Sequence, residues 1–102
     1  VGQDSEKRRE EVTCMIVRNR VEDFDRWKAV FDSESERHRD AGLKLVNLWQ
    51  TVEDPNNFFF VLEVADIDKA KDFIGAPESV EAGEKAGVLD GEYYFVKSVP
   101  GF

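Results

Sequence analysis

The sequence predicts an α+β protein in which strands and helices follow in the order β-α-β-β-α-β. The strongest indication is the run at residues 58–64, FFFVLEV, whose aromatic and β-branched residues are typical of a strand. Residues 12–17, VTCMIV, form a second run of this kind, and a segment of helical periodicity separates the two. Successive strand residues point to opposite faces, so these runs predict a sheet that is covered on both faces.

Length and composition are those of one folded domain. The chain has 102 residues, of which 41% are hydrophobic, and this suits a single core of modest size. Residues 1–11 are nearly all polar or charged, so we expect them to form an N-terminal tail outside the core. Residues 12–102 are then expected to form the single domain.

Charge and hydropathy argue against several classes of partner. A formal net charge of -8 opposes sequence-independent binding to nucleic acid or to an anionic membrane surface. No apolar run approaches the roughly 20 residues of a membrane span, and no signal peptide is recognised. We therefore expect a cytoplasmic protein. Cys14 is the only cysteine, so no disulfide can form within the chain.

The first helix is expected after the strand at residues 12–17, once residues 18–20 have turned the chain toward solvent. Asp23 is a suitable N-cap, and Gly42 suits the left-handed position that ends a helix. Between them, one face carries side chains at steps of three and four residues. These are Phe24, Trp27, Phe31, Glu34 or Ser35, and His38, with Val30 beside the stripe.

Strands two and three are expected to form an antiparallel hairpin. Residues 43–52 read as the second strand, residues 53–57, EDPNN, as a turn, and residues 58–64 as the returning strand. On the second strand, Asn47 and Trp49 share one parity with Leu45. The other parity carries Val46 and Leu48.

Two shorter helical segments are predicted before the last strand. Asp66 caps a helix at residues 67–74, and Pro77 opens another helical segment that ends at Gly87. Residues 88–91 lead into the last strand, which we expect at residues 93–99, YYFVKSV.

This order corresponds to the ferredoxin-like arrangement, a four-stranded antiparallel sheet with its helices on one face. The other face has no cover of its own, although the strands at 12–17, 58–64 and 93–99 are apolar toward it as well. Monomers rarely expose an apolar patch of this size, so we predict a homodimer that packs sheet to sheet. The alternative is a sheet face that is exposed or covered by the tail.

Several short segments carry a resemblance to a known superfamily. They are residues 21–28 (VEDFDRWK), 31–32 (FD), 41–42 (AG), 53–56 (EDPN), 68–73 (DKAKDF) and 86–88 (AGV). Through them the chain resembles the dimeric α+β barrel proteins, and more narrowly small bacterial members related to antibiotic-biosynthesis monooxygenases. The resemblance implies dimers whose sheets form a joint barrel, with a helix–sheet pocket in each subunit. Functions vary widely on this fold, so the resemblance implies no single reaction.

His38 and Asn47 are the candidate catalytic residues. His38 is the only side chain that titrates near neutral pH without perturbation, so it is a candidate general base or haem ligand at the mouth of the pocket. The alternative interpretation is a partly buried histidine favoured by the C-terminal helix dipole. Asn47 interrupts an apolar parity, where its amide would orient a substrate carbonyl or bond to a structural neighbour, including one across the dimer.

Trp27, Phe31, Trp49 and Phe73 are candidate walls of an aromatic ligand pocket, or else ordinary core residues. One histidine, one cysteine and scattered acidic residues give no metal-ligand spacing, and no glycine-rich phosphate loop is present in the sequence. We therefore predict neither a metal site nor a cofactor.

Two hypotheses for function follow from the sequence. In the first, a homodimer binds a small apolar or aromatic molecule in each helix–sheet pocket and acts as a cofactor-independent monooxygenase or cyclase-like enzyme. His38 would accept a proton and Asn47 would orient the substrate. In the second, the protein is a non-catalytic dimeric module, structural or ligand-sensing, whose pocket is filled by its own side chains. The residues alone do not decide whether the protein is an enzyme.

Overall fold

The computed structural model describes residues 12–99 and 101, so the tail predicted at residues 1–11 lies outside the described residues. The elements are β1 (Thr13–Val21), α2 (Phe24–Ser33), α3 (Ser35–Asp40), β2 (Leu43–Gln50), β3 (Asn57–Val64), α4 (Ile67–Gly75), α5 (Pro77–Lys85) and β4 (Val88–Lys97). No helix among the described residues is long and apolar enough to span a membrane.

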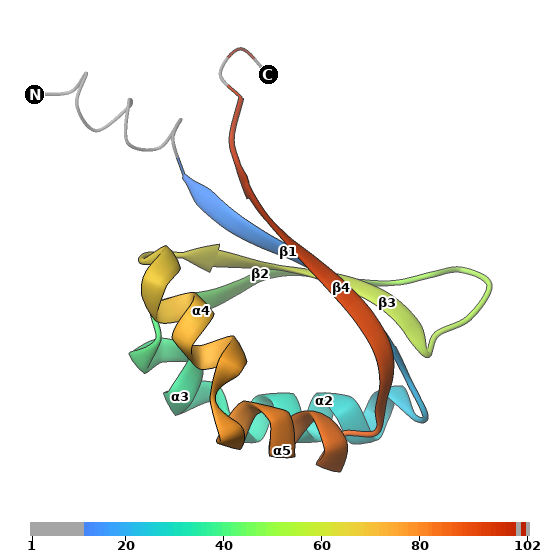
Figure 1. The fold of residues 1–102 in the computed structure, drawn as a ribbon. Coiled ribbons are helices and arrows are strands. Elements are labelled where there is room, and N and C mark those ends of the chain that lie inside the picture. The colour runs from blue at the N-terminus through green and yellow to red at the C-terminus, as the bar shows by residue number, and fades with distance from the viewer. Residues whose placement is uncertain (1–11, 100, 102) are drawn as a thin grey trace, which may run out of the picture.

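The strands form one antiparallel sheet in the order β2-β3-β1-β4. All the labelled helices lie on one side of this sheet (Figure 1). This arrangement confirms the predicted ferredoxin-like α+β fold and the β2–β3 hairpin. We call the side that packs against the helices the core face and the other side the open face.

The core lies between the core face and the helices. Alternate residues of β3 are buried there because strand side chains alternate between faces, and Phe58 is fully buried at its centre. Met15, Val17 and Val21 extend this layer on β1. Leu43 adds to this layer from β2, and Trp27, Ala70 and Ala86 close it from the helices and the segment after α5.

The capping residues predicted from the sequence lie at the ends of the observed helices. The Asp23 carboxylate accepts hydrogen bonds from the backbone N–H groups of Asp25 and Arg26, which would otherwise have no partner in the first turn. Asp66 caps α4 through the N–H of Lys69, and Pro77 occupies the first turn of α5. Gly42 has a φ of 76°, the left-handed conformation predicted for it.

Two strand boundaries differ most from the prediction. Residues 18–20 do not turn away, because β1 continues to Val21, and β4 begins at Val88 instead of residue 93. The arginine side chains that suggested a turn are instead paired with acidic residues of β4 on the open face. Arg18 donates hydrogen bonds to Asp90 and Glu92, and Arg20 donates to Asp90.

The first helical region is divided, where the sequence predicted one continuous helix. Residue Glu34 lies between α2 and α3 with φ and ψ of -97° and 12°, and its N–H bonds to the carbonyl of Phe31 at 3.1 Å. Ser33 also donates to the Val30 carbonyl through its hydroxyl, at 2.6 Å. Such side-chain bonds compete with helical geometry, which accounts for a bend at this point.

A β-bulge in β2 exchanges the faces of the sheet to which side chains in the second half of the strand would otherwise point. Leu45 pairs with Leu62, but Asn47 pairs with Val61, so Val46 is an extra residue at a β-bulge. Before the bulge, Leu43 and Leu45 lie on the core face. After it, Asn47 and Trp49 lie on the open face.

The open face is apolar along a row that crosses all four strands. Asn47, Val61, Ile16 and Tyr94 are successive neighbours in this row. Trp49, Phe59 and Val96 lie on the same face, and these three together with Ile16 and Tyr94 are between 37% and 61% exposed. In Figure 1 no labelled helix lies on this side of the sheet. An apolar surface of this extent favours contact with a partner.

Candidate functional site

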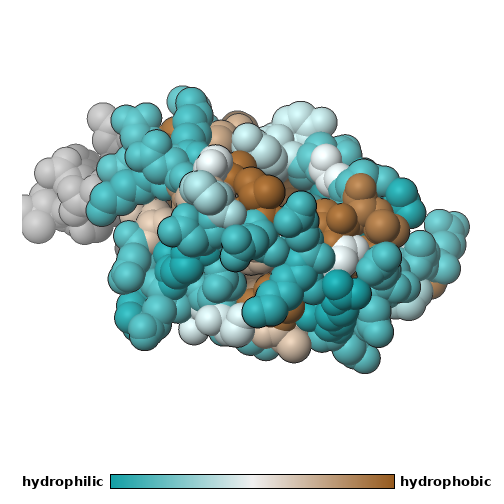
Figure 2. Space-filling model, turned by 60° about the horizontal axis from the view of Figure 1, so that its bottom comes forward, coloured by the Kyte–Doolittle hydropathy of each residue, from teal (hydrophilic) through white to brown (hydrophobic). Residues whose placement is uncertain are grey.

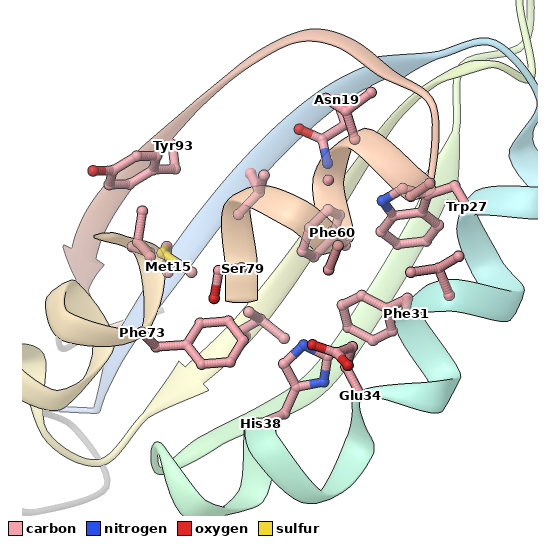
Figure 3. A pocket seen from close by; sticks show the side chains of 18 residues that line it. Met15, Asn19, Trp27, Phe31, Glu34, His38, Phe60, Phe73, Ser79 and Tyr93 are labelled. Carbon is pink, nitrogen blue, oxygen red and sulfur yellow. The ribbon is translucent and has the colours of Figure 1, made fainter. Parts of the chain in front are cut away.

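A cavity of about 360 Å³ lies between the core face and the helices. Its walls come from β1, β3 and the start and middle of β4, and from α2, α3, α4 and α5. This volume falls within the usual range of small-molecule sites. Figure 2 views the helix side, where hydrophobic surface is visible between hydrophilic side chains, and Figure 3 shows the residues that line the cavity.

Aromatic rings form a continuous wall along one side of the cavity. Trp27 stacks against Phe31 with ring centroids 4.9 Å apart. Phe60 from β3 approaches both rings, at 5.2 Å from Trp27 and 5.6 Å from Phe31. These contacts follow from the helical spacing of residues 27 and 31, which places both side chains above the same strand. The wall can hold a flat apolar molecule without offering it a charge.

His38 lies at the end of this aromatic wall, between Phe31 of α2 and Phe73 of α4. Its ring centroid is 4.4 Å from that of Phe31 and 5.3 Å from that of Phe73. Burial lowers the pKa of His38, because a charged imidazolium loses hydration among these rings. Glu34 opposes this shift and Arg37 reinforces it. His38 is therefore a neutral imidazole at pH 7, able to accept a proton.

Arg37 links three helical segments beside His38. Its guanidinium donates hydrogen bonds to the carboxylate of Glu34 and to the hydroxyl of Ser79 in α5, the latter at 3.0 Å. It also lies over the ring of Phe73, 4.7 Å from the ring centroid. These contacts fix the Arg37 guanidinium and join α3 to α4 and α5 at the edge of the cavity.

Asn19 is a cavity residue that the sequence prediction missed. It lines the cavity from the core face of β1, whereas residues 18–20 were expected to leave the sheet. The alternation of Met15, Val17 and Val21 on one parity is the signal that would have revealed the longer strand. Glu34, Ser79 and Tyr93 also contribute polar atoms to the lining.

The six predicted site residues fall into two groups. His38, Trp27, Phe31 and Phe73 all line the cavity. Asn47 and Trp49 do not line it, because the bulge in β2 directs them to the open face, where Trp49 is 52% exposed. The structure thus brings the predicted base together with three of the four predicted walls.

Solved structures of other proteins share this architecture. A protein from Bordetella bronchiseptica, provisionally named an antibiotic biosynthesis monooxygenase, superposes with a TM-score of 0.70 at 16% identity, over 87% of this chain and 98% of the other. A conserved protein from Methanosarcina mazei gives a TM-score of 0.69 at 14% identity, over 92% and 99%. The fold is that of the antibiotic biosynthesis monooxygenases.

A further structure, named an antibiotic biosynthesis monooxygenase, matches with a TM-score of 0.63 at 19% identity, over 86% of this chain and 99% of the other. No family model matches the chain, and no curated protein matches its sequence. The resemblance seen in the sequence is therefore confirmed at the level of the fold. Structural similarity at such low sequence identity indicates the fold and not the activity, so the evidence for function has to come from the cavity itself.

Proposed function

We propose that this protein binds a small, flat, apolar or aromatic molecule in its helix–sheet cavity and removes a proton from it, as a cofactor-independent monooxygenase or a cyclase-like enzyme. One observation carries the proposal: a neutral imidazole, His38, lies at the edge of an apolar cavity of about 360 Å³. A base is most effective when its pKa is close to the working pH and its surroundings exclude water.

In the proposed reaction, His38 accepts a proton from an acidic C–H group of the ligand, which leaves an enolate. Oxygenation would convert a CH₂ group to C=O with O₂, the second oxygen atom leaving as water. Cyclisation would instead direct the enolate carbon to a carbonyl of the same molecule. Both outcomes begin with the same proton transfer, so His38 has the same role in each.

The aromatic wall would position the ligand for this step. The rings of Trp27, Phe31 and Phe73 line the cavity, and an aromatic ligand gains both apolar burial and ring contacts against them. Holding the ligand C–H near a fixed base supplies much of the advantage of an enzyme over a base in solution. The shape of the wall therefore favours a planar ligand.

We further propose that two copies pack through their open faces. The apolar row across the sheet and the exposed rings of Trp49, Phe59 and Tyr94 support this assembly, because burial of such surface is the main driving force of association. Asn47 lies within the same row, so in the dimer its amide would meet a neighbour across the interface. Trp49 would also belong to the interface.

Exchange of a ligand proton with solvent tests the base directly. The probe is 5-hydroxy-2-indanone, a planar ketone with acidic CH₂ groups at one end and a hydroxyl group at the other, incubated with the protein in D₂O while NMR follows the loss of its CH₂ signals. His38→Gln retains a polar side chain that cannot act as a base near pH 7, and we expect it to lower the protein-dependent rate by about 100-fold or more. Glu36→Gln, on the exposed side of α3, is the matched control and should exchange at the wild-type rate.

The same experiment separates the two classes of function. Exchange that requires His38 supports an enzyme. Binding of 5-hydroxy-2-indanone without any protein-dependent exchange favours the ligand-sensing module instead. An unchanged exchange rate in His38→Gln would remove His38 from the role of proton acceptor.

A further inference from the structure

Two uncharged polar groups face the cavity away from His38. They are the side-chain amide of Asn19 and the indole N–H of Trp27, which Figure 3 shows at the same end. Within residues 12–99, all fully buried side-chain nitrogen and oxygen atoms have hydrogen-bond partners. No partner within the described residues bonds to either of these two groups. Both must therefore retain accessible surface, and the cavity supplies it.

The register of the sheet places the two groups together. Asn19 on β1 pairs directly with Phe58 on β3, and both side chains lie on the core face. The ring of Trp27 lies over Phe58, with centroids 4.4 Å apart. Paired side chains across antiparallel strands are immediate neighbours, so the indole of Trp27 sits above the strand position next to Asn19.

Gly91 fixes the room available to the Asn19 amide. It pairs with Asn19 from β4, and a Cβ atom there would lie 2.4 Å from Oδ1 of Asn19 and 2.5 Å from the carbonyl oxygen of Arg18. The absence of a side chain at residue 91 thus lets the asparagine amide lie across the neighbouring strand. The amide is held against the core face, facing the cavity, by its neighbours on both sides.

We propose that Asn19 and Trp27 form a binding site for an uncharged oxygen atom of the ligand, a ketone or a hydroxyl group. Both groups can donate a hydrogen bond to such an oxygen, and the asparagine amide can also accept one. No charged side chain lines this end, and the protein carries a formal net charge of -8, so a carboxylate or phosphate would find no compensating cation here. This inference rests on the proposed ligand cavity and specifies the ligand class and its orientation.

The orientation follows from the two ends of the cavity. A ligand oxygen held by Asn19 and Trp27 directs the opposite end of the molecule to His38, so the acidic CH₂ groups must lie at that opposite end, as they do in 5-hydroxy-2-indanone when its hydroxyl group is bound. Asn19 then takes the orienting role that the sequence prediction assigned to Asn47. A site built to bond to an oxygen discriminates against an analogue that lacks it, because its polar groups are left without partners.

The test compares two probes of equal shape, 2-indanone and indane, which differ only in the ketone oxygen. Binding is followed by ¹H–¹⁵N NMR of the indole N–H groups of Trp27 and Trp49, the latter on the open face as an internal reference. We expect 2-indanone to shift the Trp27 indole proton downfield and to leave that of Trp49 unchanged. In Asn19→Leu, the affinity for 2-indanone should fall about five- to tenfold, while the affinity for indane should be retained or increased.

Trp27→Phe provides a second variant, since it removes the indole N–H but keeps an aromatic ring in the wall. It should reduce the affinity for 2-indanone more than that for indane. Equal losses for both probes in both variants would overturn the oxygen site, while leaving the cavity as a ligand site. Failure of both probes to bind wild-type protein would remove the cavity proposal and this one together. The two failures are therefore distinguishable.

Discussion

The imidazole of His38 lies against the ring of Phe31, with centroids 4.4 Å apart and planes inclined by 32°. The two residues are on separate helices, α3 and α2, so the bend at Glu34 brings them into contact. Burial among such rings lowers the pKa of His38, because the aromatic surface takes the place of water around the imidazole. Both the stability of the protein and the proposed chemistry depend on it.

The first prediction concerns stability against pH. The folded-state pKa of His38 is lowered from 6.5, so the unfolded chain binds a proton more readily than the folded chain. The contribution of His38 to stability is therefore complete above about pH 6.5 and is lost as pH falls from there through the folded-state pKa. Urea unfolding at fixed protein concentration should show this loss in wild type and a smaller one in His38→Gln. Parallel pH profiles for the two proteins would contradict it.

The second prediction concerns the charges beside His38. Arg37 lowers the pKa of His38 and Glu34 raises it, so the two substitutions should act in opposite directions. Arg37→Ala should raise the pKa, because it removes a cation and releases Glu34 from its ion pair. Glu34→Gln should lower the pKa. NMR titration of the His38 ring protons measures both shifts, and shifts of the same sign would contradict the opposing effects of Glu34 and Arg37 on His38.

The third prediction concerns assembly. Native mass spectrometry of the wild type should give twice the 11.7 kDa mass of the chain. Phe59→Lys places a charge on the open face, at a residue that is 39% exposed in the single chain, and should yield a folded monomer. Val80→Lys makes the same kind of change on α5, on the helix side, and should remain dimeric. A monomeric wild type would exclude the sheet-to-sheet dimer.

The fourth prediction concerns the close approach of β4 to Asn19. Gly91→Ala should destabilise the fold by about 1–3 kcal/mol, because the added methyl group would displace the backbone carbonyl of Arg18 as well as the Asn19 amide. Gly75→Ala is the control, since nothing lies within 4 Å of the added atom. Chemical denaturation at one protein concentration compares them. Equal stability of the two variants would mean that the strands are farther apart at Gly91 than described.

The sequence predicted the order of elements because each depends on local signals. The apolar runs of β1 and β3, the caps Asp23 and Asp66, and the glycine that ends α3 all act over a few residues. The stripe that carries Trp27, Phe31 and His38 obeys helical spacing, so these three were found as cavity residues.

What the sequence did not reveal depends on contacts between distant residues. Arg18 and Arg20 suggested a turn because their hydrogen-bond partners, Asp90 and Glu92, lie about seventy residues farther along the chain. For that reason Asn19, which lies between the two arginines, was not recognised as a cavity residue. The β-bulge likewise has no local signature in LKLVNLWQ, so the faces of Asn47 and Trp49 could not be assigned.

The bulge in β2 gives the chain a place where losing one residue does not exchange the two faces of the sheet. Deleting Val46 would restore simple alternation with Leu45 and Leu48 still on the face that holds the cavity and with Asn47 and Trp49 still on the open face. A regular strand that kept Val46 would instead bring Asn47 and Trp49 to the cavity face and move Leu48 outward. During divergence, a codon lost at this point would therefore leave both proposed surfaces as they are, whereas straightening the strand without losing the codon would exchange their residues.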